Sequence, residues 1–97
     1  MTVAMPQLAE ADLDQAFQFY NSRRPGLGER FVAEFRHAIN RILQHPRAWH
    51  PMDETYRRCQ LHRFPYGVIY RIDDAAQEIV VVAVMHMHRQ PDAWRRR

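Results

Sequence analysis

FPYGVIYRIDDAAQEIVVVAVMHMH, residues 64–88, is the stretch that decides the fold. Its first part, residues 64–72, is rich in the aromatic and β-branched side chains that favour strands. Its last part, residues 78–88, is apolar at every position from 79 to 85, as expected for a central strand covered on both faces. Because the turn DDAA, residues 73–76, separates the two strands, we expect them to be antiparallel neighbours.

Strand geometry assigns these side chains to faces, because neighbouring residues of a strand point to opposite sides. The first strand is predicted to carry Val68, Tyr70 and Ile72 on one face, and Ile69 and Arg71 on the other. Unbroken alternation in the second strand predicts Ile79, Val81, Ala83 and Met85 on one face, and Val80, Val82 and Val84 on the other. The same rule places His86 and His88 together at the strand end. Pro65 has no N–H for the sheet and is expected at a strand start, a bulge or an edge.

The sequence before this stretch predicts two helices. Apolar side chains recur with the helical period over residues 7–20, with Pro6 suited to the first helical position, and again over residues 31–43. A break at Pro25-Gly26 reverses the chain between them, and His45-Pro46 ends the second helix. Two apolar-striped helices with a short connection predict an antiparallel helical hairpin, whose remaining apolar surface needs a sheet to cover it.

The remaining segments complete an expected α+β domain. Residues 46–54 are interpreted as an irregular loop, residues 55–63 as a strand and residues 1–5 as one more short strand. A short helical turn is expected at residues 91–94. The predicted order is β-α-α-β-β-β in a single domain, residues 1–97, with the helical hairpin packed on a small, mainly antiparallel sheet.

Composition narrows the class of protein. The 97 residues are 46% hydrophobic and 26% charged, as in an ordinary globular domain rather than a disordered chain. All 14 basic residues are arginines, against 11 acidic residues, and a net charge of +3 is too small by itself to indicate nucleic-acid binding. The single cysteine, the absence of a signal-like N-terminus and the shortness of the longest apolar run predict a cytoplasmic protein with no membrane partner.

Four separated segments resemble one known family. They are Ala9–Leu13, Arg24–Phe31, Arg63–Ile72 and the ending with His86, Arg89, Pro91 and Trp94. Together they are similar to the RelE/ParE superfamily of type II toxin–antitoxin toxins, over almost the whole chain. The resemblance implies the same β-α-α-β-β-β architecture and a small toxin that a cognate antitoxin neutralises.

The resemblance leaves the target open. The favoured branch is ParE-like, which implies a plasmid-stabilisation toxin that binds and inhibits DNA gyrase. The alternative is RelE-like, which implies a ribosome-dependent endoribonuclease that cuts messenger RNA without a metal. A third hypothesis is an inactive homologue that only binds the antitoxin. None of the three implies a cofactor.

The nuclease alternative needs groups that deprotonate the ribose 2′-OH, protonate the leaving oxygen and hold the phosphate. His86 and His88 are the candidate proton-transfer groups, and the candidate phosphate contacts are Arg58, Arg63, Arg71 and Arg89. A histidine at a strand end is also a common packing residue, and scattered arginines are usually solvated. We therefore expect binding rather than enzymatic activity. A zinc site at His62, His86 and His88 would need more converging ligands, so no metal is expected.

Candidate partner-binding residues lie on the first helix and at the C-terminus. Phe19 falls outside the apolar stripe that contains Tyr20, which indicates either an exposed contact surface or packing beside the loop around Trp49. The arginine-rich tail adds Arg89, Trp94 and Arg95 as contacts for an antitoxin or for a target. Cys59 is either a thiolate activated by neighbouring arginines or, more simply, an inert buried thiol.

Overall fold

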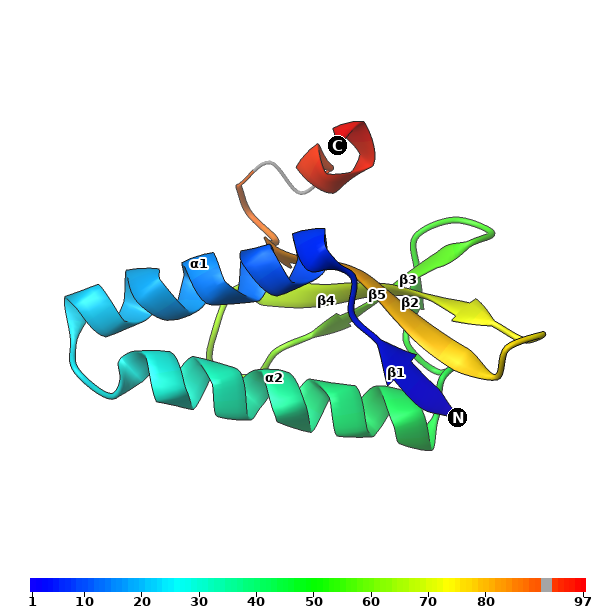
Figure 1. Ribbon diagram of the computed structural model, residues 1–97, viewed down its shortest axis with the longest axis horizontal. Coiled ribbons are helices and arrows are strands. Elements are labelled where there is room, and N and C mark those ends of the chain that lie inside the picture. The colour runs from blue at the N-terminus through cyan, green and yellow to red at the C-terminus, as the bar shows by residue number, and fades with distance from the viewer. Residues whose placement is uncertain (90–91) are drawn as a thin grey trace.

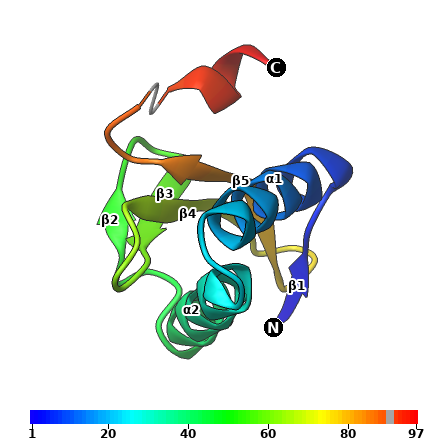
Figure 2. The same ribbon diagram turned by 90° about the vertical axis from the view of Figure 1, so that its left-hand side faces the viewer.

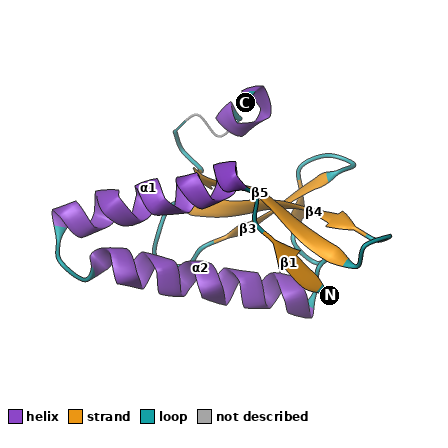
Figure 3. Cartoon of the chain, viewed as in Figure 1, coloured by secondary structure: helices purple, strands orange, loops and turns teal. Residues whose placement is uncertain are grey.

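Two antiparallel helices lie on one face of a five-stranded sheet in the computed structural model, which describes residues 1–89 and 92–97 (Figure 1). The helices are α1, Gln7–Arg23, and α2, Leu27–Gln44. The strands are β1 (Thr2–Ala4), β2 (His50–Pro51), β3 (Tyr56–Gln60), β4 (Tyr66–Asp73) and β5 (Glu78–His86). A 3-10 helix, η1 (Ala93–Arg96), ends the chain. This arrangement confirms the α+β class (Figure 3).

The sheet order is β1-β5-β4-β3-β2. Strands β3, β4 and β5 are consecutive antiparallel neighbours, as expected. Strand β1 pairs in parallel with the edge of β5 that faces away from β4. The interpretation of residues 46–54 as wholly irregular was wrong, because His50 and Pro51 pair with β3 as the two-residue strand β2. A two-residue strand that includes Pro51 shows no alternation of its own. It forms because the Asp53 carboxylate accepts the N–H groups of Thr55 and Tyr56, both at 2.8 Å, and turns the chain back.

The helical hairpin depends on a close approach of its two helices. Pro6 precedes α1 rather than opening it, because its ψ of 164° is extended while its carbonyl oxygen accepts the N–H of Glu10. The turn between the helices uses Gly26 at a φ of +90°, a conformation that glycine adopts without steric cost. At Gly28 an added Cβ would lie 2.7 Å from the carbonyl oxygen of Phe17, so only glycine allows the helices to pack this closely.

The core fills the space between the helices and the sheet. Its largest fully buried side chains on this face come from α2, β4 and β5: Phe31, Ile42, Val68, Tyr70, Ile79 and Val81. The hydroxyl group of Tyr70 donates a hydrogen bond of 2.5 Å to the carbonyl oxygen of Pro46, which anchors the segment after α2 to the sheet. Burial raises the pKa of Tyr70 to about 12. We call this face of the sheet the helix-side face.

A β-bulge in β5 changes the predicted faces. Tyr70 pairs with Val81, but Ile69 pairs with Ala83, so Val82 is an extra residue without a partner in β4. Val84 therefore joins Ile79 and Val81 in the helix-side core, while Ala83 packs with Ile69 on the opposite face. The expectation of unbroken alternation was wrong for Ala83, Met85 and Val84. The bulge reverses every assignment beyond Val82, so the side chain of His86 shares its face with Val84.

The opposite face, which we call the outer face, is covered by η1 (Figure 2). Trp94 is 6% exposed and packs on Ile69 and Ala83, and its ring meets the edge of the Tyr56 ring at 4.8 Å between centroids. The C-terminal helical turn was predicted over residues 91–94 and is found at Ala93–Arg96, so the prediction was displaced; Pro91 lies outside the described residues. Trp94 is thus the residue through which η1 packs on this side.

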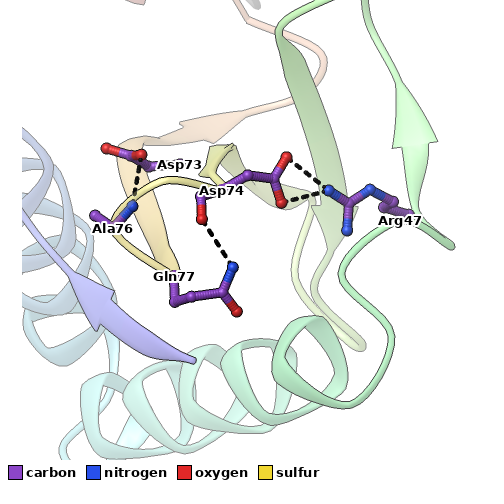
Figure 4. Close-up of polar contacts among 5 residues, drawn as sticks. All are labelled: Arg47, Asp73, Asp74, Ala76 and Gln77. Atoms are coloured by element: carbon purple, nitrogen blue, oxygen red, sulfur yellow. Dashed lines mark hydrogen bonds and ion pairs between the residues drawn. The ribbon is translucent and has the colours of Figure 1, made fainter.

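The turn between β4 and β5 is tied to the segment after α2 (Figure 4). The carboxylate of Asp73 accepts the N–H of Ala76, and the side chain of Gln77, at a φ of +53°, donates to the carbonyl oxygen of Asp74. The guanidinium of Arg47 donates two hydrogen bonds to Asp74, at 2.6 and 2.8 Å.

In the described part of the chain, neither helix is long and apolar enough to span a bilayer.

Candidate functional site

The last residue of β5, His86, lies at the edge of an aromatic cluster. It pairs with Tyr66, the first residue of β4, and the two ring centroids are 5.3 Å apart. The Tyr66 ring in turn meets Tyr20 of α1 at 6.0 Å. Arg89 follows three residues after His86. Its positive charge adds to the lowering of the pKa of His86, and it opposes the rise that burial causes in the pKa of Tyr20 and of Tyr66.

The environment of His86 favours its neutral form. Burial, the positive charge of Arg89 and the neighbouring His88 all lower the pKa of His86 below its usual value of 6.5. The Nδ1 atom of His86 lies 3.1 Å from the backbone N–H of His88, which donates to it. The neutral ring therefore carries its proton on Nε2. Burial raises the pKa of Tyr66 as well, so its hydroxyl group also keeps its proton.

A groove of about 640 Å³ opens beside this cluster, between α1, the end of β5 and η1. Its lining includes Phe19, Tyr66, His86, Arg89 and Arg97. Phe19 is 38% exposed, with the Arg23 guanidinium 4.7 Å from its ring centroid. We call this the His86 groove. It presents an aromatic ring beside hydrogen-bond donors and positive charge, a surface suited to acceptor-rich groups of a partner.

The predicted nuclease residues are distributed over separate parts of the molecule. His86 and Arg89 are brought together, with His88 ring-to-ring against His86 at 5.9 Å. Arg58 lies on the outer face, where its side chain and Met87 close over Gly67. Arg71 is five positions along β4 from Tyr66, about 17 Å at the usual rise of a strand. Arg63 lies in the turn before β4 and faces α2.

The predicted partner-binding residues also lie in different parts of the molecule, some at the His86 groove and some in η1. Phe19 and Arg89 line the His86 groove, and Tyr20 lies behind Phe19, with 5.1 Å between the ring centroids. The alternative that Phe19 packs beside Trp49 was wrong, because Trp49 donates its indole N–H to Arg41 near the opposite end of α2. Trp94, a residue of η1, is buried against the outer face, and the Arg95 guanidinium covers its ring at 4.5 Å.

Sequence reasoning missed the contacts that hold η1 in place. Asp12 of α1 accepts two hydrogen bonds of 2.6 Å from the guanidinium of Arg97, and also accepts the backbone N–H of Val84 at 3.0 Å. Arg97 also donates to the carbonyl oxygen of Val82 at 2.9 Å. One of these backbone groups belongs to the bulge residue Val82 and the other lies two residues beyond it, and the bulge has no signature in the sequence. The sequence around Asp12 therefore does not distinguish it from an ordinary exposed helix residue.

Two other candidate sites have a clear structural outcome. Cys59 is buried, and burial raises the pKa of its thiol, so the inert alternative holds and the activated thiolate does not. Within residues 1–89 and 92–97, no three side chains of His, Cys, Asp or Glu are arranged to hold a metal ion.

Comparison with known proteins shows what this chain is similar to. A family described as "ParE toxin of type II toxin-antitoxin system, parDE" matches residues 3–91. The chain is 38% identical to "Toxin ParE2" of Mycobacterium tuberculosis, in strains CDC 1551 / Oshkosh and ATCC 25618 / H37Rv, over 85 residues covering 87% of this chain and 79% of that protein.

Two solved structures share the fold at lower identity. A chain of "Chromosomal ParDE TA system from P. aeruginosa" superposes with a TM-score of 0.77 at 20% identity, covering 89% of this chain and 95% of that one. A chain of the toxin–antitoxin complex RelBE2 from Mycobacterium tuberculosis superposes with a TM-score of 0.61 at 21% identity, covering 88% and 95%. The family match over residues 3–91 and the 38% identity to ParE2 establish the family of this chain. This chain belongs to the ParE toxin family of type II toxin–antitoxin systems.

Proposed function

We propose that this toxin acts in the cytoplasm by binding and inhibiting DNA gyrase, and that a cognate antitoxin holds it inactive. The observation that carries the proposal is the His86 groove, which gathers Phe19, His86 and Arg89 on one surface. An exposed aromatic ring among hydrogen-bond donors is typical of a protein-binding surface, where aromatic residues and arginine supply most of the affinity.

The distribution of arginines supports binding over cleavage. A metal-free nuclease must place its base, its acid and its phosphate contacts within reach of one scissile bond. Here His86 and Arg89 line one groove, whereas Arg58 and Arg71 belong to other parts of the sheet. The ribonuclease alternative would have to work without the predicted phosphate contacts Arg58 and Arg71, so we rank it second.

Two assays with the same purified protein separate these functions. One measures the supercoiling of relaxed plasmid by gyrase; the other maps cleavage of a translated message by primer extension. We expect supercoiling to stop and the message to stay intact. Phe19→Asp and Arg89→Glu are expected to weaken inhibition about tenfold or more each, because both lie in the groove. The matched control Arg36→Glu, exposed on α2, should inhibit like the wild type. Cleaved message with unaffected supercoiling would replace this proposal by the nuclease alternative.

Growth experiments test the antitoxin and the biological role. Expression of the toxin alone should stop growth, and co-expression with the antitoxin encoded beside it should restore growth. A plasmid that carries both genes should be retained without selection longer than one that carries neither. Normal growth during expression of the toxin alone would indicate the third hypothesis, an inactive homologue that only binds its antitoxin.

A further inference from the structure

A second groove lies at the edge of the sheet where β2 runs beside β3. Its volume is about 390 Å³, and its lining includes Arg41, Trp49, His50, Arg58, Gln60 and His62. We call it the Arg58 groove. Among the described residues it shares no lining side chain with the His86 groove, so the two grooves can contact different partners at the same time.

The short strand β2 leaves part of this sheet edge open. It pairs with β3 only at residues 57 and 58, so in the described structure no strand lies on the outward side of Cys59 and Gln60. His50 lies directly opposite Arg58, and Gln60 is two positions further along β3, so these three side chains leave the sheet on one face. Three hydrogen-bond donors therefore stand together at an edge that a ligand can reach.

The helix side of the groove is held in place by Arg41 of α2 and by Trp49. The Arg41 guanidinium donates to the backbone carbonyl oxygen of Gln60 at 3.0 Å and lies 5.9 Å from the centroid of the Trp49 ring. The indole N–H of Trp49 donates to the backbone carbonyl oxygen of Arg41 at 3.2 Å. A guanidinium carries five N–H groups, so these contacts position Arg41 and still leave it donors for a ligand.

The groove carries positive charge without a counter-charge of its own. Its described lining contains two guanidinium groups, two imidazoles and one carboxamide, but no carboxylate. The guanidinium of Arg58 has no ion-pair or hydrogen-bond partner within residues 1–89 and 92–97. Asp53, in the turn after β2, is paired with Arg95 at 3.0 Å and also accepts two backbone N–H groups. A ligand that balances this charge must therefore bring negatively charged oxygen atoms.

The donors of the groove fit a phosphate better than a carboxylate. They come from α2, β2, β3 and the segment after β3, and therefore approach a ligand from several directions. A carboxylate accepts hydrogen bonds mainly in its own plane, whereas a tetrahedral phosphate accepts them from all sides. Arginine and glutamine side chains are common phosphate contacts in protein–DNA complexes, where they position the protein without reading the sequence.

We infer that the Arg58 groove binds a backbone phosphate of the DNA that gyrase holds. Arg41 and Arg58 supply the positive charge, and Gln60 and His62 supply further hydrogen-bond donors. This inference rests on the proposed function, since gyrase brings the DNA to the toxin. It adds that the toxin contacts the enzyme through the His86 groove and the DNA through the Arg58 groove. A single phosphate contact is weak, but binding to gyrase raises the effective concentration of the DNA beside it.

Duplex binding by the full-length toxin tests the inference directly. The probe is a short fluorescent DNA duplex, titrated with toxin at low and at high salt and followed by anisotropy. Arg58→Gln/His62→Gln should bind about tenfold more weakly, and the slope of log affinity against log salt should fall by about one, because a phosphate contact is lost. The control Arg36→Gln/His37→Gln removes the same side-chain types from exposed positions of α2 outside the groove. It should change the affinity less than about twofold.

Binding to immobilised gyrase, with and without the same duplex, separates this inference from the proposed function. The wild type should bind the gyrase–DNA complex about fivefold or more tightly than gyrase alone. Arg58→Gln/His62→Gln should lose this preference and bind gyrase alone like the wild type. A toxin that binds gyrase equally with and without DNA contradicts the inference only. A toxin that does not bind gyrase at all contradicts the proposed function.

Competition experiments define the chemistry of the occupant. Unlabelled duplex should displace the fluorescent duplex, whereas polyglutamate at the same concentration of charge should displace it about tenfold less well. Equal displacement by polyglutamate would show that the groove takes carboxylates, which overturns the inference. Stronger displacement by single-stranded RNA than by duplex DNA would also overturn it, and would favour the nuclease alternative.

A last measurement avoids dependence on the folding of any variant. Amide hydrogen exchange is compared for the wild-type toxin alone and with a saturating concentration of the duplex. Protection should increase at residues 49–51 and 58–62, which form the walls of the Arg58 groove. An unchanged exchange pattern in both segments would rule out this DNA contact, whatever the variants show.

Discussion

The two faces of the sheet are protected in very different ways. On the helix-side face, two long helices bury side chains such as Phe31 and Ile42 completely. On the outer face, a four-residue 3-10 helix covers the sheet with one tryptophan. The cover is held by ion pairs from Arg95 to Asp53 and from Arg97 to Asp12. Since hydrophobic stabilisation scales with buried apolar area, most of the stability belongs to the helix-side face and the outer face is the easier one to open.

Phe31→Ala is expected to have the largest effect on stability and tests the contribution of the helix-side face. Phe31 is fully buried; its ring stacks on Tyr20 and meets Phe64 and Tyr66 edge-to-face. Its truncation should lower the free energy of unfolding by about 3–5 kcal/mol, because it removes burial and leaves a cavity. Urea unfolding followed by circular dichroism measures the change. A loss below about 1 kcal/mol would show that the helix-side face does not dominate stability.

Trp94→Ala applies the same truncation to the outer face. We expect a loss of about 2–3 kcal/mol, smaller than for Phe31→Ala although the side chain is larger, because the short η1 segment can shift to fill the space. The variant should also bind more of a hydrophobic dye, since Ile69 and Ala83 become accessible. Equal losses in the two variants would remove the distinction between the faces.

The helix-side face should also show a specific pH dependence through Tyr70. Its pKa is about 12 in the folded protein and about 10 in the unfolded chain, so the folded state keeps the proton over this range. The stabilisation is complete below pH 10 and is lost as the pH rises toward 12, by up to about 2 kcal/mol. Tyr70→Phe, which cannot ionise, should flatten this part of the pH profile of stability. If the substitution leaves the pH profile of stability unchanged, the raised pKa of Tyr70 is contradicted.

Asp12→Ala is expected to have the smallest effect. It removes the acceptor of Arg97 and of the Val84 N–H and should cost about 1–2 kcal/mol. Because η1 loses one attachment, proteolysis after Arg95 and Arg96 should accelerate more than global unfolding does. Limited trypsin digestion, compared with the urea midpoint of the same variant, measures this difference. A variant with unchanged tail cleavage would show that Trp94 and the Arg95–Asp53 ion pair hold the segment without Asp12.

Much of the fold could be predicted from local patterns. The helical period over residues 7–20 and 31–43, the proline after the second helix and the apolar run from 79 to 85 each depend on neighbours in the chain. The same patterns could not show β2, since a two-residue strand has no period, nor where η1 begins. The candidate site was predicted in part: Phe19, His86 and Arg89 line one groove, whereas Tyr66 and Arg97 were found only in the structure.

The sequence by itself determined the helical hairpin, the antiparallel order of β3, β4 and β5, and the kinship with toxins, because periodicity and ordered motifs are properties of the chain. Only the tertiary structure decided which face each residue of β5 occupies. One bulge at Val82 exchanges the faces of Ala83 and Val84 and thereby puts His86 on the same side of the sheet as α1. Asp12 and Arg97, 85 residues apart in sequence, bind backbone groups at this bulge: Asp12 accepts the N–H of Val84 and Arg97 donates to the carbonyl oxygen of Val82, so contacts that are distant in the chain satisfy it.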